Sequence, residues 1–148
     1  MEAKLLKIRW PELDKEVLVE PVEVNKELFD WFVENTPCKS IQGHAVVSGD
    51  LTYTKTIPVH KPMKFMYSAL EAMLLTEAPV GTIFINVSRG KVGTIMMKYS
   101  SDITEDMPYP VIGRVRKEDL GIAKEVGDMV WDAIYNTKRI LTCQFEEV

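Results

Sequence analysis

The sequence predicts a mainly β protein with two or three helices, whose strands form a closed antiparallel barrel of about eight strands. Two observations carry this prediction. Short runs rich in β-branched and aromatic residues recur along the chain between turn residues, and only a few stretches show the apolar spacing of a helix. The helices do not alternate regularly with the strands, as they would in a parallel sheet. The pattern therefore favours hairpins that close on one another.

The clearest hairpin spans residues 81–100. Its two β-rich runs, residues 81–87 and 92–99, are joined by Ser88-Arg89-Gly90-Lys91. Gly90 can adopt a positive φ at little cost, so this loop can close a hairpin. Both faces of the first run carry apolar residues, which predicts central strands rather than an edge. Gly93 is expected at a barrel corner without room for a branched side chain.

The chain before this hairpin adds two further hairpins and a helix. Pro21 predicts that the end of its strand lies outside a central ladder, because proline has no N–H to donate. Asn25 is expected to cap a helix of about ten residues that ends before Asn35-Thr36-Pro37. The predicted strands are residues 4–10, residues 16–22, a run from Cys38 to a turn at Ser48-Gly49-Asp50, and residues 51–57.

A second helix is predicted at residues 62–78, because Met63, Met66 and Leu70 recur at helical spacing between two prolines. The remaining predicted elements are an acidic loop at residues 101–110, a strand at 111–115, a helical stretch at 118–135 that is broken at Gly127, and a last strand at 138–146.

Composition limits the classes of function. The 148 residues fit one domain, 1–148, and the hydrophobic and charged fractions of 46% and 27% are those of a globular protein. A net charge of −4 argues against a nucleic-acid partner, which needs a basic surface. No apolar run reaches the roughly 18 residues of a membrane span, so neither a membrane nor a membrane partner is predicted. A cytoplasmic location is expected, and monomer and homodimer both stay open.

Cysteine and histidine are the residues most often used for metal binding and acid–base chemistry. Cys38 and Cys143 lie far apart, without a CxxC pattern, and are expected to be small buried hydrophobic residues rather than a disulfide or a catalytic thiol. The spacing of these cysteines with His44 and His60 matches no zinc motif, so no metal or cofactor is predicted. His44 and His60 are the candidate catalytic residues, and Asp50 is the carboxylate nearest to His44 in sequence.

Several segments carry a family resemblance. GTIFINVSRGKVGTIMMKYS is similar in spacing to the cyclophilin segment GxLxMAN…NGSQFFI, with Gly93 at the glycine before Ser-Gln-Phe-Phe, and Val111-Ile-Gly-Arg-Val115 resembles the cyclophilin VFGxV element. The chain also resembles small archaeal and bacterial cyclophilin-like proteins of unassigned function, through residues 48–53 with Pro58-Val59 and through residues 106–115. The resemblance implies one closed antiparallel eight-stranded cyclophilin-like β-barrel.

Cyclophilins catalyse peptidyl-prolyl isomerisation, which requires stabilisation of a twisted amide against a barrier of about 18–20 kcal/mol. The family does this with an arginine on the strand after the first helix and with a hydrophobic proline pocket. This chain has no arginine between Arg9 and Arg89, and its Gln-Phe-Phe positions are Ile95, Met96 and Met97. Lysine does not reproduce the planar guanidinium fork. The sequence therefore predicts a barrel without the isomerase apparatus.

If the barrel keeps the family's surface cleft, the resemblance places Asn86, Thr94, Ile95 and Met97 on its floor. One of Met96 and Met97 is expected to face into the barrel and the other out. An apolar floor with two hydrogen-bonding groups suits a small molecule or a peptide side chain. The predicted function is thus a small-ligand- or peptide-binding module. The alternative is an enzyme, either a weak prolyl isomerase or one that performs condensation or lyase chemistry on small metabolites, since some cyclophilin-like barrels resemble opine-forming enzymes.

An isomerisation assay on a short proline peptide tests the missing apparatus. We expect no rate above background, because the guanidinium and the aromatic rings are absent from the motif positions. A rate that Met97→Arg abolishes and Lys55→Ala preserves would contradict this interpretation of the pocket.

Overall fold

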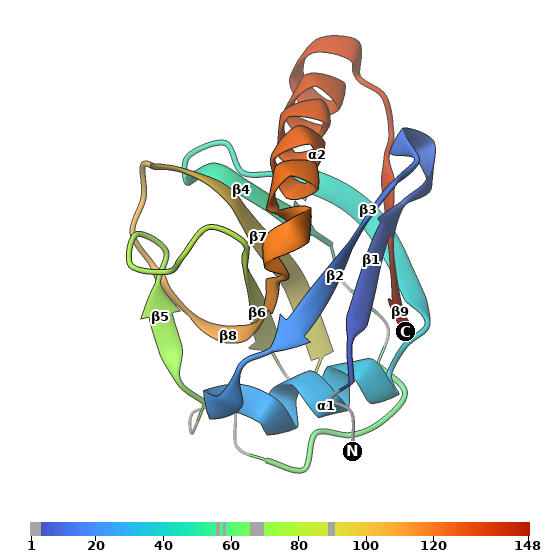
Figure 1. The fold of residues 1–148 in the computed structure, drawn as a ribbon, viewed down its shortest axis with the longest axis vertical. Helices are drawn as coiled ribbons and strands as arrows, with labels where there is room; N and C mark the ends of the chain where they lie inside the picture. Colours follow the sequence, from blue (N-terminus) through green and yellow to red (C-terminus); the bar gives the residue numbers. More distant parts are fainter. Residues whose placement is uncertain (1–3, 56, 58, 66–69, 89–90) are drawn as a thin grey trace.

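The computed structural model describes residues 4–55, 57, 59–65, 70–88 and 91–148. The strands of these residues are β1 (Leu6–Trp10), β2 (Lys15–Pro21), β3 (Cys38–His44), β4 (Gly49–Thr54), β5 (Ala72–Leu74), β6 (Thr82–Ser88), β7 (Lys91–Ile103), β8 (Pro108–Val115) and β9 (Thr142–Glu147). They pair in the order β2-β1-β9-β3-β4-β7-β6-β8-β5, all antiparallel, and β8 also pairs with β2. All strands except β5 therefore form a closed antiparallel barrel of eight strands, as predicted (Figure 1).

Side chains alternate between the barrel interior and the outside, because successive residues of a strand face opposite ways. In β1, Leu6, Ile8 and Trp10 are buried, whereas Arg9 is exposed. Two helices, α1 (Lys26–Glu34) and α2 (Leu120–Asp132), lie at opposite ends of the barrel (Figure 1). Each adds its apolar face to the same buried core. Full burial of one such large apolar side chain contributes about 1.5–3 kcal/mol.

The predicted central hairpin is confirmed. β6 and β7 pair in the register Ile83↔Met97 and Ile85↔Ile95, and their outer neighbours are β8 and β4. Gly90 lies outside the described residues. The crowding expected at Gly93 is wrong: a Cβ there would come no closer than 3.4 Å to its nearest neighbour, the Asn86 carbonyl oxygen. The register shifts beside Gly93, and such a bulge moves a residue out of the ladder.

The barrel closes where β2 meets β8, and a proline lies in this ladder. Val19 pairs with Val115, and Pro21 pairs with Gly113. The prediction that Pro21 lies outside a central ladder is therefore wrong. Proline is tolerated at this position because it is the last residue of β2, where the ladder needs no further N–H donor. A Cβ on Gly113 would lie 2.5 Å from the Glu20 carbonyl oxygen. Glycine is therefore needed for the two strands to approach.

The predicted helix at residues 62–78 is wrong over its described part. Residues 62–65 have no regular structure, residues 66–69 lie outside the described range, and residues 72–74 form β5, which pairs with β8. The Asn25 side chain accepts a hydrogen bond from the Glu71 amide and donates to the Glu71 carbonyl, at 3.0 and 2.9 Å. These bonds hold the backbone of residue 71 beside the first residue of β5. Asn25 is the N-cap residue of α1, as predicted, but its side chain makes no capping hydrogen bond to the helix and bonds to residue 71 instead.

A second, smaller core lies outside the barrel, under the segment that follows β5. Leu75 and Ala78 cover Phe84, Met96 and other buried side chains of the barrel strands. Lys98 is buried beside them, and its Nζ donates to the carbonyl oxygens of Leu75 and Ala78 at 2.8 and 2.7 Å. Burial lowers the pKa of Lys98. This lysine therefore ties the segment to β7.

Two further predictions about the second half of the chain are wrong. β7 continues to Ile103 and β8 begins at Pro108, so the acidic loop is only the tip of a hairpin. Gly127 does not break α2. It is buried, and the ring of Tyr99 occupies the space that a Cβ would need. A glycine in the middle of this helix therefore allows close packing on the barrel.

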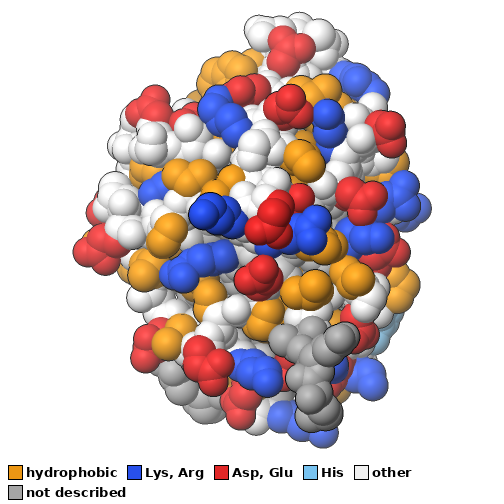
Figure 2. All heavy atoms as spheres, viewed as in Figure 1, with side chains coloured by type: hydrophobic (Ala, Val, Ile, Leu, Met, Phe, Trp, Pro, Cys, Tyr) orange, Lys and Arg blue, Asp and Glu red, His pale blue; other side chains and the backbone are white. Residues whose placement is uncertain are grey.

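The surface that carries α2 and the β1–β2 hairpin mixes charges of both signs with small, separate hydrophobic groups (Figure 2). In the described parts of the chain, no helix is both long enough and apolar enough to cross a bilayer.

Two glycines of α2 provide a matched test of this packing. Gly127→Ala should lower the free energy of unfolding by about 1–3 kcal/mol, because the new methyl group collides with the Tyr99 ring. Gly121→Ala should leave it unchanged or raise it by up to about 1 kcal/mol, because nothing lies within 4 Å of the added atom. Chemical denaturation of both variants measures the difference. Equal effects would contradict the close approach.

Candidate functional site

A cavity of about 460 Å³ lies where the end of α2 faces the turn between β1 and β2. That turn is η1 (Pro11–Leu13), and the segment of residues 138–141, which leads into β9, contributes Arg139 to the wall. The volume falls in the range of small-molecule sites. The lining residues combine an apolar floor with charged groups at the rim, and they are Leu13, Asp128, Met129, Asp132, Ala133, Thr137 and Arg139.

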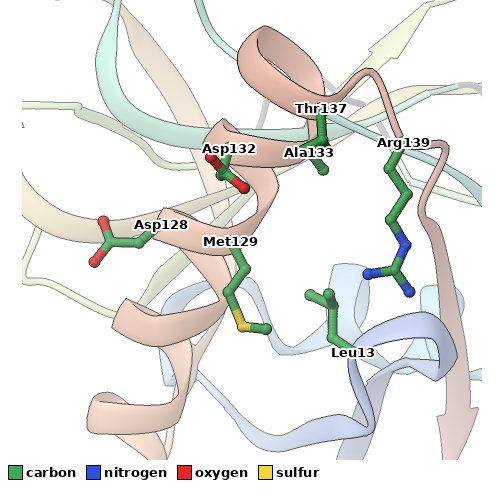
Figure 3. Close-up of a pocket in the computed structure, with 7 residues that line it drawn as sticks. All are labelled: Leu13, Asp128, Met129, Asp132, Ala133, Thr137 and Arg139. Carbon is green, nitrogen blue, oxygen red and sulfur yellow. The ribbon is translucent and has the colours of Figure 1, made fainter.

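Helical spacing directs the α2 residues to this cavity. Asp128 and Asp132 are four residues apart, as are Met129 and Ala133, so both pairs lie on one side of the helix. The chain continues into a π-helical turn, η5 (Ala133–Thr137), and reverses at Lys138, which has a positive φ of 59°. This reversal brings Arg139 back toward the helix. Figure 3 shows Met129 and the Arg139 guanidinium on either side of Leu13, with Asp128 directed away.

Glu12 fixes the wall opposite α2. Its two carboxylate oxygens accept hydrogen bonds from the Thr142 amide and the Thr142 hydroxyl, at 2.6 and 2.7 Å. Burial acts to raise the pKa of Glu12, but these bonds and the charge of Arg139 outweigh it, so the pKa is lowered. Arg139 Nη2 donates to the Glu12 backbone oxygen at 2.6 Å. The turn η1 and the start of β9 are therefore held together by one residue.

The two carboxylates of the cavity have different partners. Both oxygens of Asp128 accept bonds from Lys124 Nζ, at 2.8 and 2.6 Å, so this charge is already paired. Asp132 accepts a neutral hydrogen bond from Asn136 through Oδ1, at 2.9 Å. The site therefore presents a guanidinium and a separate carboxylate beside Leu13, Met129 and Ala133. Such a site can bind a molecule that carries charges of both signs and an apolar group.

The two candidate catalytic histidines are not brought together. His44 is buried, with Nδ1 at 2.7 Å from the Ala45 carbonyl oxygen and Nε2 at 2.6 Å from the Tyr99 hydroxyl. A carbonyl only accepts, so Nδ1 carries the hydrogen and Nε2 accepts from Tyr99. Burial lowers the pKa of His44, although Asp50 and Asp128 oppose the shift. Both ring nitrogens are thus occupied. His60 is exposed, and its backbone N–H donates to Asn35.

Neither cysteine is activated. Both are free thiols on neighbouring strands, where Cys38 pairs with Phe145 and Cys143 pairs with Ser40. Burial raises the pKa of Cys38 to about 11 and that of Cys143 to about 12. Among the described residues, no three His, Cys, Asp or Glu side chains gather as a metal site would require.

The four residues predicted as the floor of a cleft fall on two faces of the sheet. Asn86 and Thr94 form a cross-strand pair and are exposed and half-buried, respectively. Ile95 and Met97 are buried, and Met97 belongs to the barrel core whereas Met96 belongs to the outer core. The opposite orientation of the two methionines is as predicted. A ligand-binding role for these four residues stays a prediction, and none of them lines the α2 cavity.

None of the residues that line the α2 cavity was predicted from the sequence as a site residue. A signal existed for Asp128 and Asp132, whose spacing places two carboxylates on one helical face. Nothing in the sequence indicated that Leu13 and Arg139 would meet them. β3 is the strand after α1, where cyclophilins carry the catalytic arginine. The one lysine or arginine of this strand is Lys39, which is exposed.

The eight-stranded ring and its two helices define the class of the protein as a cyclophilin-like barrel. No protein-family model matches the chain, and no curated protein sequence matches it. Among solved structures, the chain is similar to McbB in complex with tryptophan, with a TM-score of 0.77 and 26% sequence identity. The match covers 95% of this chain and 44% of McbB, so the chain spans less than half the length of that protein.

Replacement of Glu12 tests the cavity wall. Glu12→Gln should lower the free energy of unfolding by about 1–2 kcal/mol at neutral pH, because the Thr142 bonds lose their charge. The folded-state pKa is lowered, so the stabilisation is present above the unfolded value of about 4.3 and is lost as the pH falls. Denaturation of both proteins across this range measures it. Glu16→Gln, which removes only a surface ion pair with Lys7, is the control. An equal loss in both variants would contradict the clamp.

Proposed function

We propose that the protein binds a free α-amino acid with a large apolar side chain in the cavity between α2, η1 and residues 138–141. The observation that carries this proposal is the pair of opposite charges, Asp132 and Arg139, beside an apolar floor. A zwitterion needs both charges, and its side chain needs the floor. The same arrangement suits neither a purely apolar ligand nor a polyanion.

Arg139 is suited to the ligand carboxylate. A guanidinium has five N–H donors, and one of the Arg139 donors is bonded to the Glu12 backbone oxygen. The remaining donors can form the paired, charge-assisted bonds that carboxylates favour. The Glu12 contact also limits the freedom of a long side chain, which lowers the entropic cost of binding.

Asp132 and the floor account for the rest of the molecule. The Asp132 carboxylate supplies a partner for an ammonium group on the α2 side of the cavity. Met129 is flexible and polarisable, so it can adjust to an aromatic or long aliphatic side chain above Leu13. The binding of tryptophan by McbB, a protein of similar fold, supports an amino acid of this kind.

A binding function is favoured over an enzymatic one by the state of His44. An acid or base must reach the proton that it transfers, and both nitrogens of His44 already have partners. Condensation or lyase chemistry on small metabolites is the alternative, for which Asp132 is the cavity's candidate acid or base. The cytoplasmic location and a second cleft with Asn86, Thr94, Ile95 and Met97 on its floor stay predictions.

Calorimetric titration with L-tryptophan tests the proposal. Arg139→Gln and Asp132→Asn should each weaken binding by about tenfold or more, which corresponds to about 1.4 kcal/mol. Tryptamine lacks the carboxylate and should be insensitive to Arg139→Gln, and indole-3-propionate lacks the amine and should be insensitive to Asp132→Asn. Arg114→Gln, an exposed arginine on β8, is the control. Binding that survives both cavity substitutions, or no binding of any apolar amino acid, would sink the proposal.

A further inference from the structure

A buried polar chain joins β3, β7 and β4 beneath α2. His44 lies at the end of β3 and accepts a hydrogen bond from the Tyr99 hydroxyl of β7. The Asp50 carboxylate of β4 is also close to that hydroxyl, and burial together with this negative charge raises the pKa of Tyr99. Asp50 in turn accepts the Asp102 amide at 3.2 Å. Tyr99 therefore lies between a buried imidazole and a half-buried carboxylate.

The C-terminal half of α2 rests on this chain. The Trp131 ring packs edge-on against His44, with centroids 4.9 Å apart, and contacts the Tyr135 ring in a tilted arrangement with centroids 4.2 Å apart. The Tyr135 hydroxyl makes a long contact of 3.5 Å with the His44 carbonyl oxygen. One turn earlier, Gly127 lies against the Tyr99 ring. The opposite side of the same helical segment carries Met129 and Asp132, which line the cavity.

Protonation of His44 changes this arrangement. With hydrogens on both ring nitrogens, Nε2 donates to the Tyr99 oxygen, and the Tyr99 hydroxyl turns its hydrogen toward Asp50. The direction of the hydrogen bonds reverses, and a positive charge is placed on a ring that is only 3% exposed beneath Trp131. The groups that face the imidazole are Tyr99 from β7, Asp50 from β4, and Asp128, Trp131 and Tyr135 from α2 and the turn that follows it. Lys124 of α2 pairs with Asp128 and lies 5.9 Å from the centre of the Tyr99 ring, so it weakens the effect of Asp128. The two carboxylates favour the imidazolium, and burial disfavours it more strongly. The neutral ring is therefore the form that fits the closed helix.

We propose that the His44–Tyr99–Asp50 chain is a pH-sensitive latch that fixes the C-terminal half of α2, and with it the α2 wall of the cavity, to the barrel. The latch is closed when His44 is neutral and loosens when His44 is protonated. Because the folded-state pKa of His44 is lowered, the latched state loses stability as the pH falls below the unfolded value of about 6.5. Release separates Met129 and Asp132 from Leu13 and Arg139, so the cavity opens.

The sequence contains two histidines, His44 and His60, which makes a direct test simple. Proton NMR titration follows both imidazoles, and His60→Gln assigns their signals. Amide hydrogen exchange of α2, relative to β1 in the same sample, is measured between about pH 7.5 and about pH 5, where a histidine changes its charge. The variants are His44→Gln, Tyr99→Phe and, as a matched control, His60→Gln.

In the wild type and in His60→Gln, His44 should titrate at a lower pH than an exposed histidine. Exchange of the α2 amides should accelerate about tenfold or more at acid pH relative to β1, which corresponds to a loss of about 1.4 kcal/mol in the free energy of opening. His44→Gln should abolish this acceleration. If His44→Gln does not fold, Tyr99→Phe decides: it keeps the ring against Gly127 and removes the hydroxyl, so α2 should exchange faster already at neutral pH and change less with acid. A His44 titration that matches that of an exposed histidine, with α2 exchange that parallels β1, would overturn the latch.

The effect on the cavity rests on the proposed function, and a separate arm isolates it. The affinity for L-tryptophan should fall between about pH 7.5 and about pH 5 in the wild type but not in His44→Gln. No binding at either pH contradicts the amino-acid proposal, while the exchange and titration results still decide the latch. Binding with equal pH dependence in both proteins contradicts the coupling between latch and cavity.

Discussion

The ring of Tyr99 lies directly against the backbone of α2 at Gly127, and the position of everything on that helix depends on this contact. A residue with a side chain at position 127 would hold the helix away from β7. Without the close approach, Trp131 would not cover His44, and Met129 would not face Leu13. The Tyr99 ring therefore sets the distance between α2 and the barrel. Because protein interiors are packed as densely as organic crystals, such a contact has little slack.

Polar groups are buried on the barrel side of α2 and exposed on its cavity side. Toward the barrel, His44 and Tyr99 are buried and satisfy one another, since an unpaired polar group there would cost about 1–3 kcal/mol. Toward the cavity, Asp132 and Arg139 are exposed, and each makes one hydrogen bond, to Asn136 and to the Glu12 backbone oxygen respectively. The sealed side suits a structural role that responds to pH, and the open side suits recognition of a charged ligand.

The strands were the most predictable part of the structure. Leu6, Ile8 and Trp10 alternate with charged residues, and a period of two has only one regular interpretation. The predictions failed where a distant side chain overrode local preference. The spacing of Met63 and Leu70 suggested a helix, but Asn25 holds Glu71 beside an extended segment. Helix propensity is worth tenths of a kilocalorie per residue, so a few partly buried hydrogen bonds reverse it.

The candidate site was predictable only in part. His44 was predicted as a candidate catalytic residue because it is one of two histidines in the sequence. No sequence pattern indicated that it would be buried under Trp131. By itself, the sequence determined the class of fold, because alternation and turn chemistry are local properties that a barrel must obey. The tertiary structure alone decided which charges meet, because Leu13 and Arg139 approach α2 only through the closure of the ring and the reversal at Lys138. Contacts between residues so distant in the chain are a property of packing, and no short-range pattern encodes them.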